Sequence, residues 1–428
     1  MMNVQKYPAY KNSGVEWIET VPSHWEVVKL KRLFCEKKKI TNVDLPCGSI
    51  SFGKVVYKDE EKIPEATKKS YQAVSKGEYL LNPLNLNYDL ISLRIALSDK
   101  DVVVSSGYIV LNSIVKLDKT YFKWLLHRYD VAFMKTLGSG VRQTINFSDI
   151  GDSELIFPPL PEQTAIAQFL DRKTALIDQA IDIKQKQIEL LKERRQILIH
   201  QAVTRGLNPE VKMKASGVEW IGEVPEGWEV VRLKTLGKIK YGLGQPPKTK
   251  EDGLPLIRAT NVERGRIVEK DLIFVDPEDI PWERDPMLKE NDIIVVRSGA
   301  YTGDSAIIPK HYAGSIAGYD MVLTPTSINP RFLSYTLLAK YVLYDQLYLL
   351  RMRAAQPHLN AEELGQTIIV CPPKLEQQQI FEYLENISKK IATAITLKQQ
   401  EIAKLQEYKA TLINSAVTGK IKVGSHAQ

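Results

Sequence analysis

The sequence predicts an α+β fold in which two similar domains of mixed α and β structure are joined by two long helices that form an antiparallel coiled coil. Three observations support this prediction. A 21-residue segment occurs twice with 15 identical positions, a 50-residue helical segment also occurs twice, and the stretches between them are faintly alike. Self-similarity of this kind indicates a repeated architecture. We therefore expect a pseudo-two-fold internal repeat.

The first repeated segment is rich in tryptophan. It reads SGVEWIETVPSHWEVVKLKRL from Ser13 to Leu33 and SGVEWIGEVPEGWEVVRLKTL from Ser216 to Leu236. Its tryptophans are Trp17, Trp25, Trp220 and Trp228. Base stacking is one interpretation of these rings, but large aromatic side chains beside Ile and Val normally fill cores. We expect them to seat this segment against the long helices.

The second repeated segment is a long helix in both copies. It spans 158–207 and 372–421, with 19 of 50 positions identical. Prolines precede each copy and a glutamate, Glu162 or Glu376, lies in its first turn, as is typical of a helix N-terminus. Gly206 and Gly419 are suited to the helix ends.

Alternating steps of four and three residues trace an apolar seam along each helix. The predicted seam residues are Leu170, Ile177, Ile181, Ile188, Leu191, Leu198, Leu384, Ile391, Ile395, Ile402, Leu405 and Leu412. A 3.5-residue repeat held over several heptads predicts a coiled coil, and each copy is the obvious partner of the other. About 40 residues at 1.5 Å each give a rod on the order of 60 Å. We expect it to act as a spacer.

The repeats divide the chain into seven segments. They are a frame segment at 1–28, a first domain at 29–157 (head 1), a long helix at 158–207, a linker with the second frame segment at 208–231, a second domain at 232–371 (head 2), a long helix at 372–421 and a tail at 422–428.

Charge and cysteine content limit the classes of function. The formal net charge of +7 permits a polyanionic partner, but any nucleic-acid site must be local. Cys35, Cys47 and Cys371 lie far apart, which argues against a disulfide framework or a thiolate zinc site. There is no apolar signal core and no apolar run near the roughly 18 residues of a membrane span. We expect a cytoplasmic protein with no membrane partner.

The twin segments resemble the specificity subunits of type I restriction-modification systems, the HsdS family. The residues that carry the resemblance are the Gly-x-Glu-Trp-Ile-x-x-x-Pro-x-x-Trp segments at Gly14–Trp25 and Gly217–Trp228 and the two Pro-Pro-x-x-Glu-Gln helix starts. The resemblance covers nearly the whole chain. It implies two target-recognition domains that each read half of an interrupted double-stranded DNA site. It also implies that methyltransferase subunits, expected to number two, dock on the conserved helices and that a restriction and translocase subunit joins them.

Motifs for catalysis are near misses. Gly48–Val55 nearly matches a phosphate-binding P-loop, but Val55 stands where a hydroxyl must bind magnesium, and its apolar alternation favours a strand with a basic tip. Asn82–Asn85 nearly matches an adenine-methyltransferase loop, without an accompanying Gly-rich cofactor loop. The six histidines are scattered. We predict no catalytic residue, no metal and no cofactor.

Basic, amide and tyrosine side chains of the variable stretches are the candidates for DNA contact, because Lys and Arg bind phosphates and Arg, Asn and Gln read base edges. In head 1 they are Lys54, Lys58, Lys68, Lys69, Tyr71, Asn85, Asn87, Arg94 and Arg142. In head 2 they are Lys240, Tyr241, Gln245, Lys248, Arg258, Asn261, Arg264, Arg266, Arg297 and Tyr301. Arg142–Asn146 aligns with Gln356–Asn360, so we expect this stretch to bind phosphate or anchor the domain rather than to discriminate sequence.

Two other classes of function remain open. A self-contained nuclease or methyltransferase would cleave or methylate DNA without partner subunits. A coiled-coil scaffold that binds only protein would not bind a DNA duplex.

Overall fold

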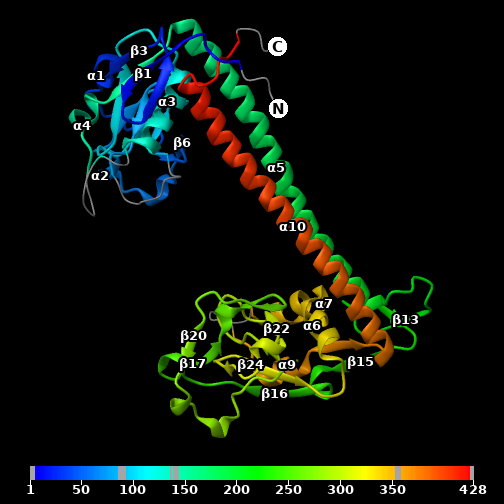
Figure 1. Cartoon of the computed structure of the whole chain (residues 1–428). Helices are drawn as coiled ribbons and strands as arrows, with labels where there is room; N and C mark the ends of the chain where they lie inside the picture. Colours follow the sequence, from blue (N-terminus) through cyan, green and yellow to red (C-terminus); the bar gives the residue numbers. More distant parts are fainter. Residues whose placement is uncertain (1–4, 85–92, 135–136, 138–143, 352–357, 425–428) are drawn as a thin grey trace. The chain divides into compact units, whose positions relative to one another are not determined.

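The computed structural model describes residues 5–84, 93–134, 137, 144–351 and 358–424. It divides into two compact units, of which unit 1 comprises 1–183 with 400–428 and unit 2 comprises 184–399. The long helices α5 (Leu160–Arg205) and α10 (Lys374–Val417) each contribute one part to either unit. Each unit therefore contains one head and one stretch of paired helix (Figure 1).

Head 1 is built on an antiparallel sheet of four strands. Its strand order is β4 (Phe34–Glu36), β11 (Ile109–Ser113), β8 (Tyr79–Leu81) and β9 (Ile95–Leu97). Successive side chains of a strand point to opposite faces. Tyr79 and Leu81 accordingly join the main core, whereas Leu80 joins a second, smaller cluster with Val102 and Val104. Both faces of the sheet are buried, which explains the continuous apolar runs of its strands.

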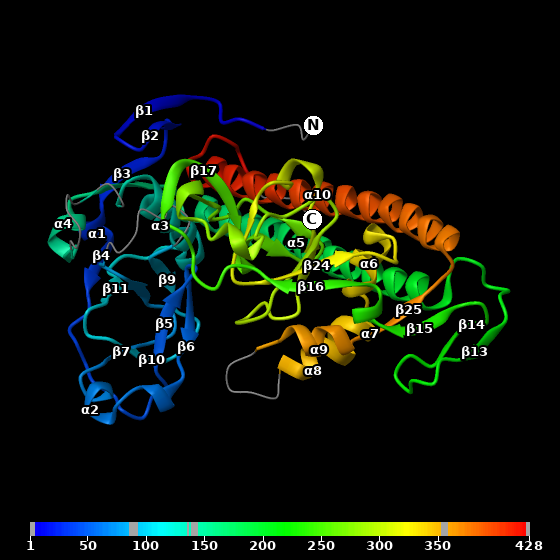
Figure 2. The same cartoon turned by 90° about the horizontal axis from the view of Figure 1, so that it is seen from below.

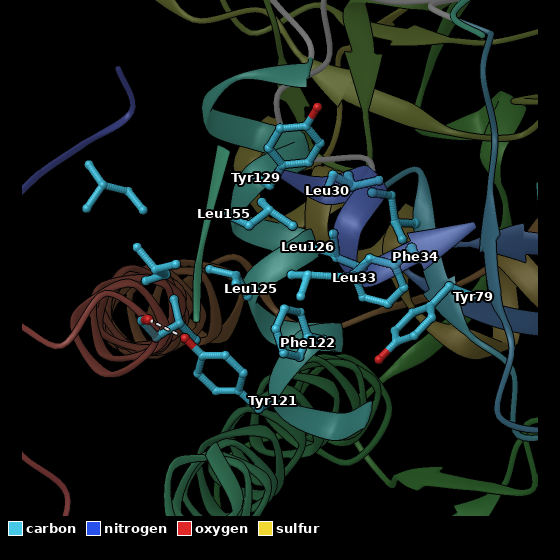
Figure 3. Packing of buried hydrophobic residues seen from close by; sticks show 14 of the residues in the cluster. Leu30, Leu33, Phe34, Tyr79, Tyr121, Phe122, Leu125, Leu126, Tyr129 and Leu155 are labelled. Carbon is cyan, nitrogen blue, oxygen red and sulfur yellow. Dashed lines mark hydrogen bonds between the residues drawn. The ribbon is translucent and has the colours of Figure 1, made fainter. Parts of the chain in front are cut away.

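Helix α3 (Lys119–Ala132) supplies most of the core on one side of this sheet. The Asp118 side chain caps it by accepting hydrogen bonds from the backbone N–H groups of Thr120 and Tyr121, both at 3.0 Å. Its apolar side chains meet those of α1 (Leu30–Leu33) and the sheet (Figure 3). The Tyr121 hydroxyl donates to the carbonyl oxygen of Val417 at 3.0 Å, so the head is fastened to α10.

The other elements of unit 1 are β1 (Tyr10–Val15), β2 (Ile18–Pro22), β3 (Glu26–Lys29), β5 (Gly48–Ser51), β6 (Lys54–Tyr57), η1 (Glu60–Lys62), α2 (Glu65–Lys68), β7 (Gln72–Val74), β10 (Val102–Val104), α4 (Phe147–Gly151) and β12 (Glu154–Phe157). Strands pair as β1–β2, β3–β12, β5–β6 and β7–β10.

Head 2 repeats the four-stranded sheet. Its order is β16 (Gly237–Tyr241), β24 (Met321–Pro325), β21 (Ile293–Val295) and β22 (Ser305–Ile307), again antiparallel. Helix α6 (Pro330–Leu338) takes the place of α3, with Asn329 as its N-cap. In both heads an edge strand is followed by the variable stretch, the next two sheet strands form the second central strand and the other edge, and the last strand inserts beside the first. The two heads share a topology.

The other elements of unit 2 are β13 (Met213–Ala215), β14 (Glu223–Pro225), β15 (Glu229–Arg232), η3 (Leu233–Thr235), β17 (Thr249–Ile257), η4 (Ala259–Asn261), β18 (Val262–Glu263), β19 (Arg266–Ile267), β20 (Ile273–Val275), η5 (Pro277–Asp279), η6 (Trp282–Arg284), η7 (Lys310–Tyr312), β23 (Ile316–Ala317), α7 (Lys340–Val342), the π-helix η8 (Leu343–Leu347), α8 (Tyr348–Arg351), α9 (Ala361–Gln366) and β25 (Ile368–Cys371). Strands β15 and β25 pair just before α10 begins (Figure 2).

The repeated glutamate of each helix start holds a repeated tryptophan. The indole N–H of Trp25 donates to Glu162 at 3.0 Å, and that of Trp228 donates to Glu376 at 2.9 Å. Both indoles are buried, and the left-handed glycines Gly419 and Gly206 lie against them. The prediction that tryptophan packs the frame segment against the helices thus describes these two residues.

Trp220 departs from that prediction. Trp17, its counterpart, is half-buried and meets the ring of Tyr129 edge-on at 5.8 Å. Trp220 is 52% exposed in the turn between β13 and β14. The prediction was wrong for Trp220, because among the described residues no aromatic ring contacts it as Tyr129 of α3 contacts Trp17.

The repeated glutamine of each helix start is a bridge. The side chain of Gln163 donates to the carbonyl oxygen of Pro158 and accepts from the backbone N–H of Asp118, at 2.7 and 2.9 Å. Gln377 makes the same two bonds, to Pro372 and from Asn329, at 2.7 and 2.8 Å. The Pro-Pro-x-x-Glu-Gln motif therefore joins the long helix to the cap of α3 or α6 in each unit.

The long helices pack antiparallel within each unit. In unit 1, Leu170 and Ile177 of α5 share a core with Leu412 of α10, and Lys409 forms a 2.6 Å ion pair with Asp178. The predicted seam residues Leu170, Ile177, Ile188, Leu384, Ile391 and Leu412 are buried, and Ile181, Leu191, Leu198, Ile395, Ile402 and Leu405 are half-buried. The predicted fold class is confirmed.

Two polar residues that interrupt the apolar seam, one from each long helix, contact one another. In unit 2 the Arg195 side chain donates to the hydroxyl of Ser388 at 3.3 Å, across the helix pair. Both residues stand where the four-and-three spacing of the seam would place an apolar side chain.

Within the described residues, no helix is both long and apolar enough to cross a membrane.

Candidate nucleic-acid interface

Arg297 of head 2 begins the loop that follows β21, and its backbone is fixed on both sides. Its N–H donates to the Asp320 carboxylate at 3.2 Å, and its carbonyl oxygen accepts from Leu359 at 2.8 Å. A bridge between Ser298 and His358 adjoins it. The position of the Cα atom is therefore set by two other segments of the head, at Asp320 and at His358–Leu359.

Two tyrosine rings lie against the Arg297 guanidinium. Its central carbon is 4.6 Å from the ring centroid of Tyr241 and 4.1 Å from that of Tyr319, which are cation–π contacts. One terminal nitrogen, Nη2, donates to the Tyr319 hydroxyl at 3.1 Å and lies 3.4 Å from His358. The Tyr241 hydroxyl in turn accepts from the Ala361 N–H at 2.9 Å. We call Tyr241, Arg297, Tyr319 and His358 the Arg297 cluster.

Asp320 supports the Arg297 cluster from beneath. Its side chain is buried, and burial raises the pKa of this carboxyl to about 6, although the backbone N–H and the charge of Arg297 favour the ionised form. Beside it, a mostly apolar hollow of about 180 Å³ is bordered by Ser298, Tyr319 and Arg258. The cluster thus combines a fixed cation, exposed aromatic rings and a small apolar recess.

Most other candidate cations of head 2 are held by protein groups. Lys240 pairs with Asp285 at 2.6 Å, and Arg266 pairs with Glu263 at 2.7 Å. Arg264 donates to the hydroxyls of Tyr344 and Tyr348 and lies 3.7 Å from Asp304. Further, Lys248 is exposed 3.7 Å from Asp279, Arg258 donates to the carbonyl of Asp271, and Gln245 and Tyr301 are exposed.

Asn261 is a structural residue rather than a surface one. Its side chain is buried and donates to the carbonyl oxygens of Val268 and Lys270 at 3.1 and 2.9 Å. It also accepts from the N–H of Arg258. Both amide hydrogens and the amide oxygen are used to fold the loop around η4, which argues against the predicted DNA contact.

The exposed candidates of head 1 lie on or near the β5–β6 hairpin. Lys54 and Lys58 are exposed, Lys69 is exposed and paired with Glu65 at 2.9 Å, and Lys68 is half-buried and paired with Glu60 at 3.0 Å. The near P-loop of the sequence is this hairpin, turning at Phe52 and Gly53 with positive φ. A phosphate-binding P-loop is followed by a helix, so the strand interpretation is correct.

Two candidates of head 1 are buried. Arg94 is 7% exposed and forms a 3.0 Å ion pair with Asp130, which is also buried. Tyr71 is 8% exposed and packs with Cys47 and Val103. The structure argues against DNA contact for both. Asn85, Asn87 and Arg142 lie outside the described residues.

Sequence reasoning missed Tyr319 and His358. The signal for Tyr319 is the echo of Ser106-Gly107-Tyr108 in Ala317-Gly318-Tyr319, which marks the entry to a central strand. His358 lies in the stretch that aligns with Arg142–Asn146 of head 1, so the sequence predicts the same role for this stretch in both heads. Their proximity to Arg297 depends on contacts across 22 and 61 residues of chain, which the sequence does not reveal.

No group of three or more His, Cys, Asp or Glu side chains within the described part of the chain could hold a metal ion. The three cysteines are unpaired by disulfides, and burial raises the pKa of the Cys47 and Cys371 thiols. The chemistry that the Arg297 cluster can perform is recognition by hydrogen bonding and stacking.

A family model described as the type I restriction modification DNA specificity domain matches residues 6–193 and 225–407, once for each repeat. The chain belongs to this family. The two matches cover most of the sequence and include both heads and most of each long helix.

Two relatives named as specificity subunits align along most of the chain. The type I restriction enzyme MjaVIII specificity subunit of Methanocaldococcus jannaschii is 25% identical over 94% of both chains. The EcoBI specificity subunit of Escherichia coli is 28% identical over 65% of this chain and 62% of its own. A solved structure on complex assembly and conformational transition of the type I R-M system has the same fold, with a TM-score of 0.71, 14% identity and coverage of 94% of this chain and 99% of that chain.

Proposed function

We propose that the chain is the DNA-reading subunit of a type I restriction-modification enzyme and that each head binds one half of a bipartite duplex site. The observation that carries the proposal is the duplicated unit. Two heads share one sheet order and one attachment to the long helices, yet differ in the polar side chains around the sheet. A repeated scaffold with different surface chemistry is suited to reading two different half-sites.

The paired helices serve as spacer and docking surface in this proposal. The seam between α5 and α10 uses one side of each helix. A second apolar stripe of α5 is exposed, with Leu176 and Ile183 in unit 1 and Leu190 and Ile197 in unit 2, seven residues apart within each pair. A seven-residue spacing keeps side chains on one side of a helix. This stripe fits a helix of a methyltransferase subunit, and two such subunits would match the two repeats.

Catalysis belongs to the partner subunits in this proposal. Methyl transfer and DNA cleavage would require the methyltransferase and the restriction and translocase subunits. This chain would determine which DNA sequence they act on. The candidate cations of the heads would bind phosphates and base edges, and neutralised phosphates release counterions. Binding is therefore expected to weaken steeply as salt is raised.

Duplex binding by the full chain, alone and with its cognate methyltransferase, tests the proposal. We expect binding to a duplex that contains the methylated site, with the logarithm of the affinity falling linearly with the logarithm of salt concentration. Methylation should require the partner. Methylation or cleavage by the chain alone would favour a self-contained enzyme, and the absence of duplex binding in both preparations would favour a protein-only scaffold.

A further inference from the structure

We propose that Arg297 reads a guanine in the half-site bound by head 2, an inference that rests on the proposed function and names the base recognised. The guanidinium would donate two hydrogen bonds to O6 and N7 of guanine in the major groove, the geometry that a planar fork of donors fits. Tyr241 and Tyr319 would hold the fork in place.

Contacts within head 2 hold the Arg297 side chain in place before DNA binds. A long arginine side chain normally loses rotamer freedom on binding, which weakens recognition. Here two tyrosine rings contact the guanidinium, and the Nη2 bond to the Tyr319 hydroxyl fixes its rotation. The cation–π contacts use the face of the guanidinium, Nε is buried and one Nη2 hydrogen goes to Tyr319, so the in-plane donors left for a base are those of Nη1 and the second Nη2 hydrogen.

The Arg297 side chain forms no direct ion pair within the part of the chain that the structure describes, although its charge favours ionisation of the nearby Asp320. By contrast, Lys240 and Arg266 are paired with acids. The Asp320 carboxylate that lies nearby accepts from the backbone N–H of Arg297 rather than from its side chain. The charge of Arg297 therefore remains available to an electronegative base edge.

The surface around the Arg297 cluster is exposed. Tyr241 and Tyr319 are each nearly half-exposed, and His358 is exposed beside them. A positive fork between exposed rings is accessible to a large, flat, polyanionic ligand. A purely structural arginine would more often be covered on its outer side.

Head 1 has Pro83 at the position that matches Arg297 of head 2. The bridge between Ser298 and His358 in head 2 corresponds to a bridge between Leu84 and Thr144 in head 1. The residue before the first partner is Arg297 in head 2 and Pro83 in head 1, and the carbonyl of each accepts a backbone hydrogen bond from the other segment. A change at Arg297 should therefore affect one half-site only.

The experiment is to map methylated sites in DNA from cells that express the full chain with its cognate methyltransferase. Wild type is compared with Arg297→Gln, with Arg297→Lys, which keeps the charge but not the fork, and with the matched control Arg331→Gln, an exposed arginine of α6 that lies over the Phe381 ring of α10 and is not a DNA-contact candidate. For both Arg297 variants we expect preference for one guanine in one half-site to fall by about tenfold, with the other half-site unchanged. The control should keep the wild-type motif.

An unchanged motif in both Arg297 variants would overturn the inference and leave a structural clamp as the role of the cluster. An equal loss at every position of the motif in both variants would overturn it too, because that pattern indicates damage to the fold. Failure of the proposed function itself would look different, since the wild-type complex would then methylate no bipartite motif. If Arg297→Gln does not fold, Arg297→Lys alone decides between these outcomes.

Discussion

Head 1 and head 2 are the same scaffold with different tips. Their sheets have the same order, and their caps receive the same glutamine bridge from the long helix. A glycine with positive φ ends the β5–β6 turn at Gly53 and the β18–β19 turn at Gly265. The residue before it is an exposed Phe52 in head 1 and Arg264, held by two tyrosine hydroxyls, in head 2.

One difference between the heads lies at a position whose backbone is held by a hydrogen bond in both. Arg297 and Pro83 occupy matching positions beside matching bridges. A scaffold of this kind lets one side chain change without a change of fold, because the hydrogen bonds at these positions are made by the backbone. Divergence in specificity is therefore expected at such positions and not in the frame.

The largest test of the shared scaffold is removal of the buried tryptophan in each unit. Trp25→Ala and Trp228→Ala each empty a fully buried aromatic site and remove the hydrogen bond to Glu162 or Glu376. We expect each to cost about 3–5 kcal/mol of unfolding free energy in its own unit. Hydrogen exchange of the two heads, followed with thermal unfolding, measures the loss unit by unit.

The matched control for these variants is Trp220→Ala. This indole is 52% exposed, so its removal should change stability by less than about 0.5 kcal/mol. If Trp220→Ala destabilised unit 2 as much as Trp228→Ala, or if only one of the two buried tryptophans mattered, the heads would not share the scaffold described above.

A smaller test concerns pH and head 2 alone. Burial raises the pKa of Asp320 to about 6, above the roughly 3.9 of an unfolded aspartate. The folded state therefore binds this proton more tightly, so the stability gained is complete below about pH 4 and is lost as pH rises through about 6. In head 1 the residue directly before the matching strand is Tyr108, which has no carboxyl group, so this pH effect is expected of head 2 alone.

Asp320→Asn should remove that loss. An amide oxygen can still accept the Arg297 N–H, and it carries no charge to desolvate. We expect wild type to lose up to about 3 kcal/mol relative to the variant between pH 4 and pH 8. Thermal unfolding of both proteins across this range is the measurement. Parallel pH profiles for the two proteins would show that Asp320 is not the group responsible.

The repeats made much of the fold predictable from the sequence. Identical Trp, Glu and Gln residues in both copies indicated shared contacts, and the 3.5-residue seam indicated the helix pair. The variable stretches gave no such signal. Arg94 and Asn261 have the side-chain chemistry of DNA contacts, yet their burial depends on partners such as Asp130 and Val268 that lie elsewhere in the chain. Whether an arginine is buried or exposed depends on its tertiary partners, and these partners cannot be identified from a single sequence.

The same limit applies to the Arg297 cluster. The sequence offered Arg297 and Tyr241 as separate candidates among nineteen. Only the register of β16 beside β24, together with the return of the chain at His358, brings them to one point with Tyr319.

The central claim is that two independent heads read two half-sites. The most direct measurement exchanges residues 29–157, and separately 232–371, for the corresponding blocks of a relative, and maps the methylated motif of each chimaera in complex with the methyltransferase. The account predicts that each exchange alters one half of the motif and leaves the other half and the spacing intact. A chimaera in which one exchange alters both halves would contradict it.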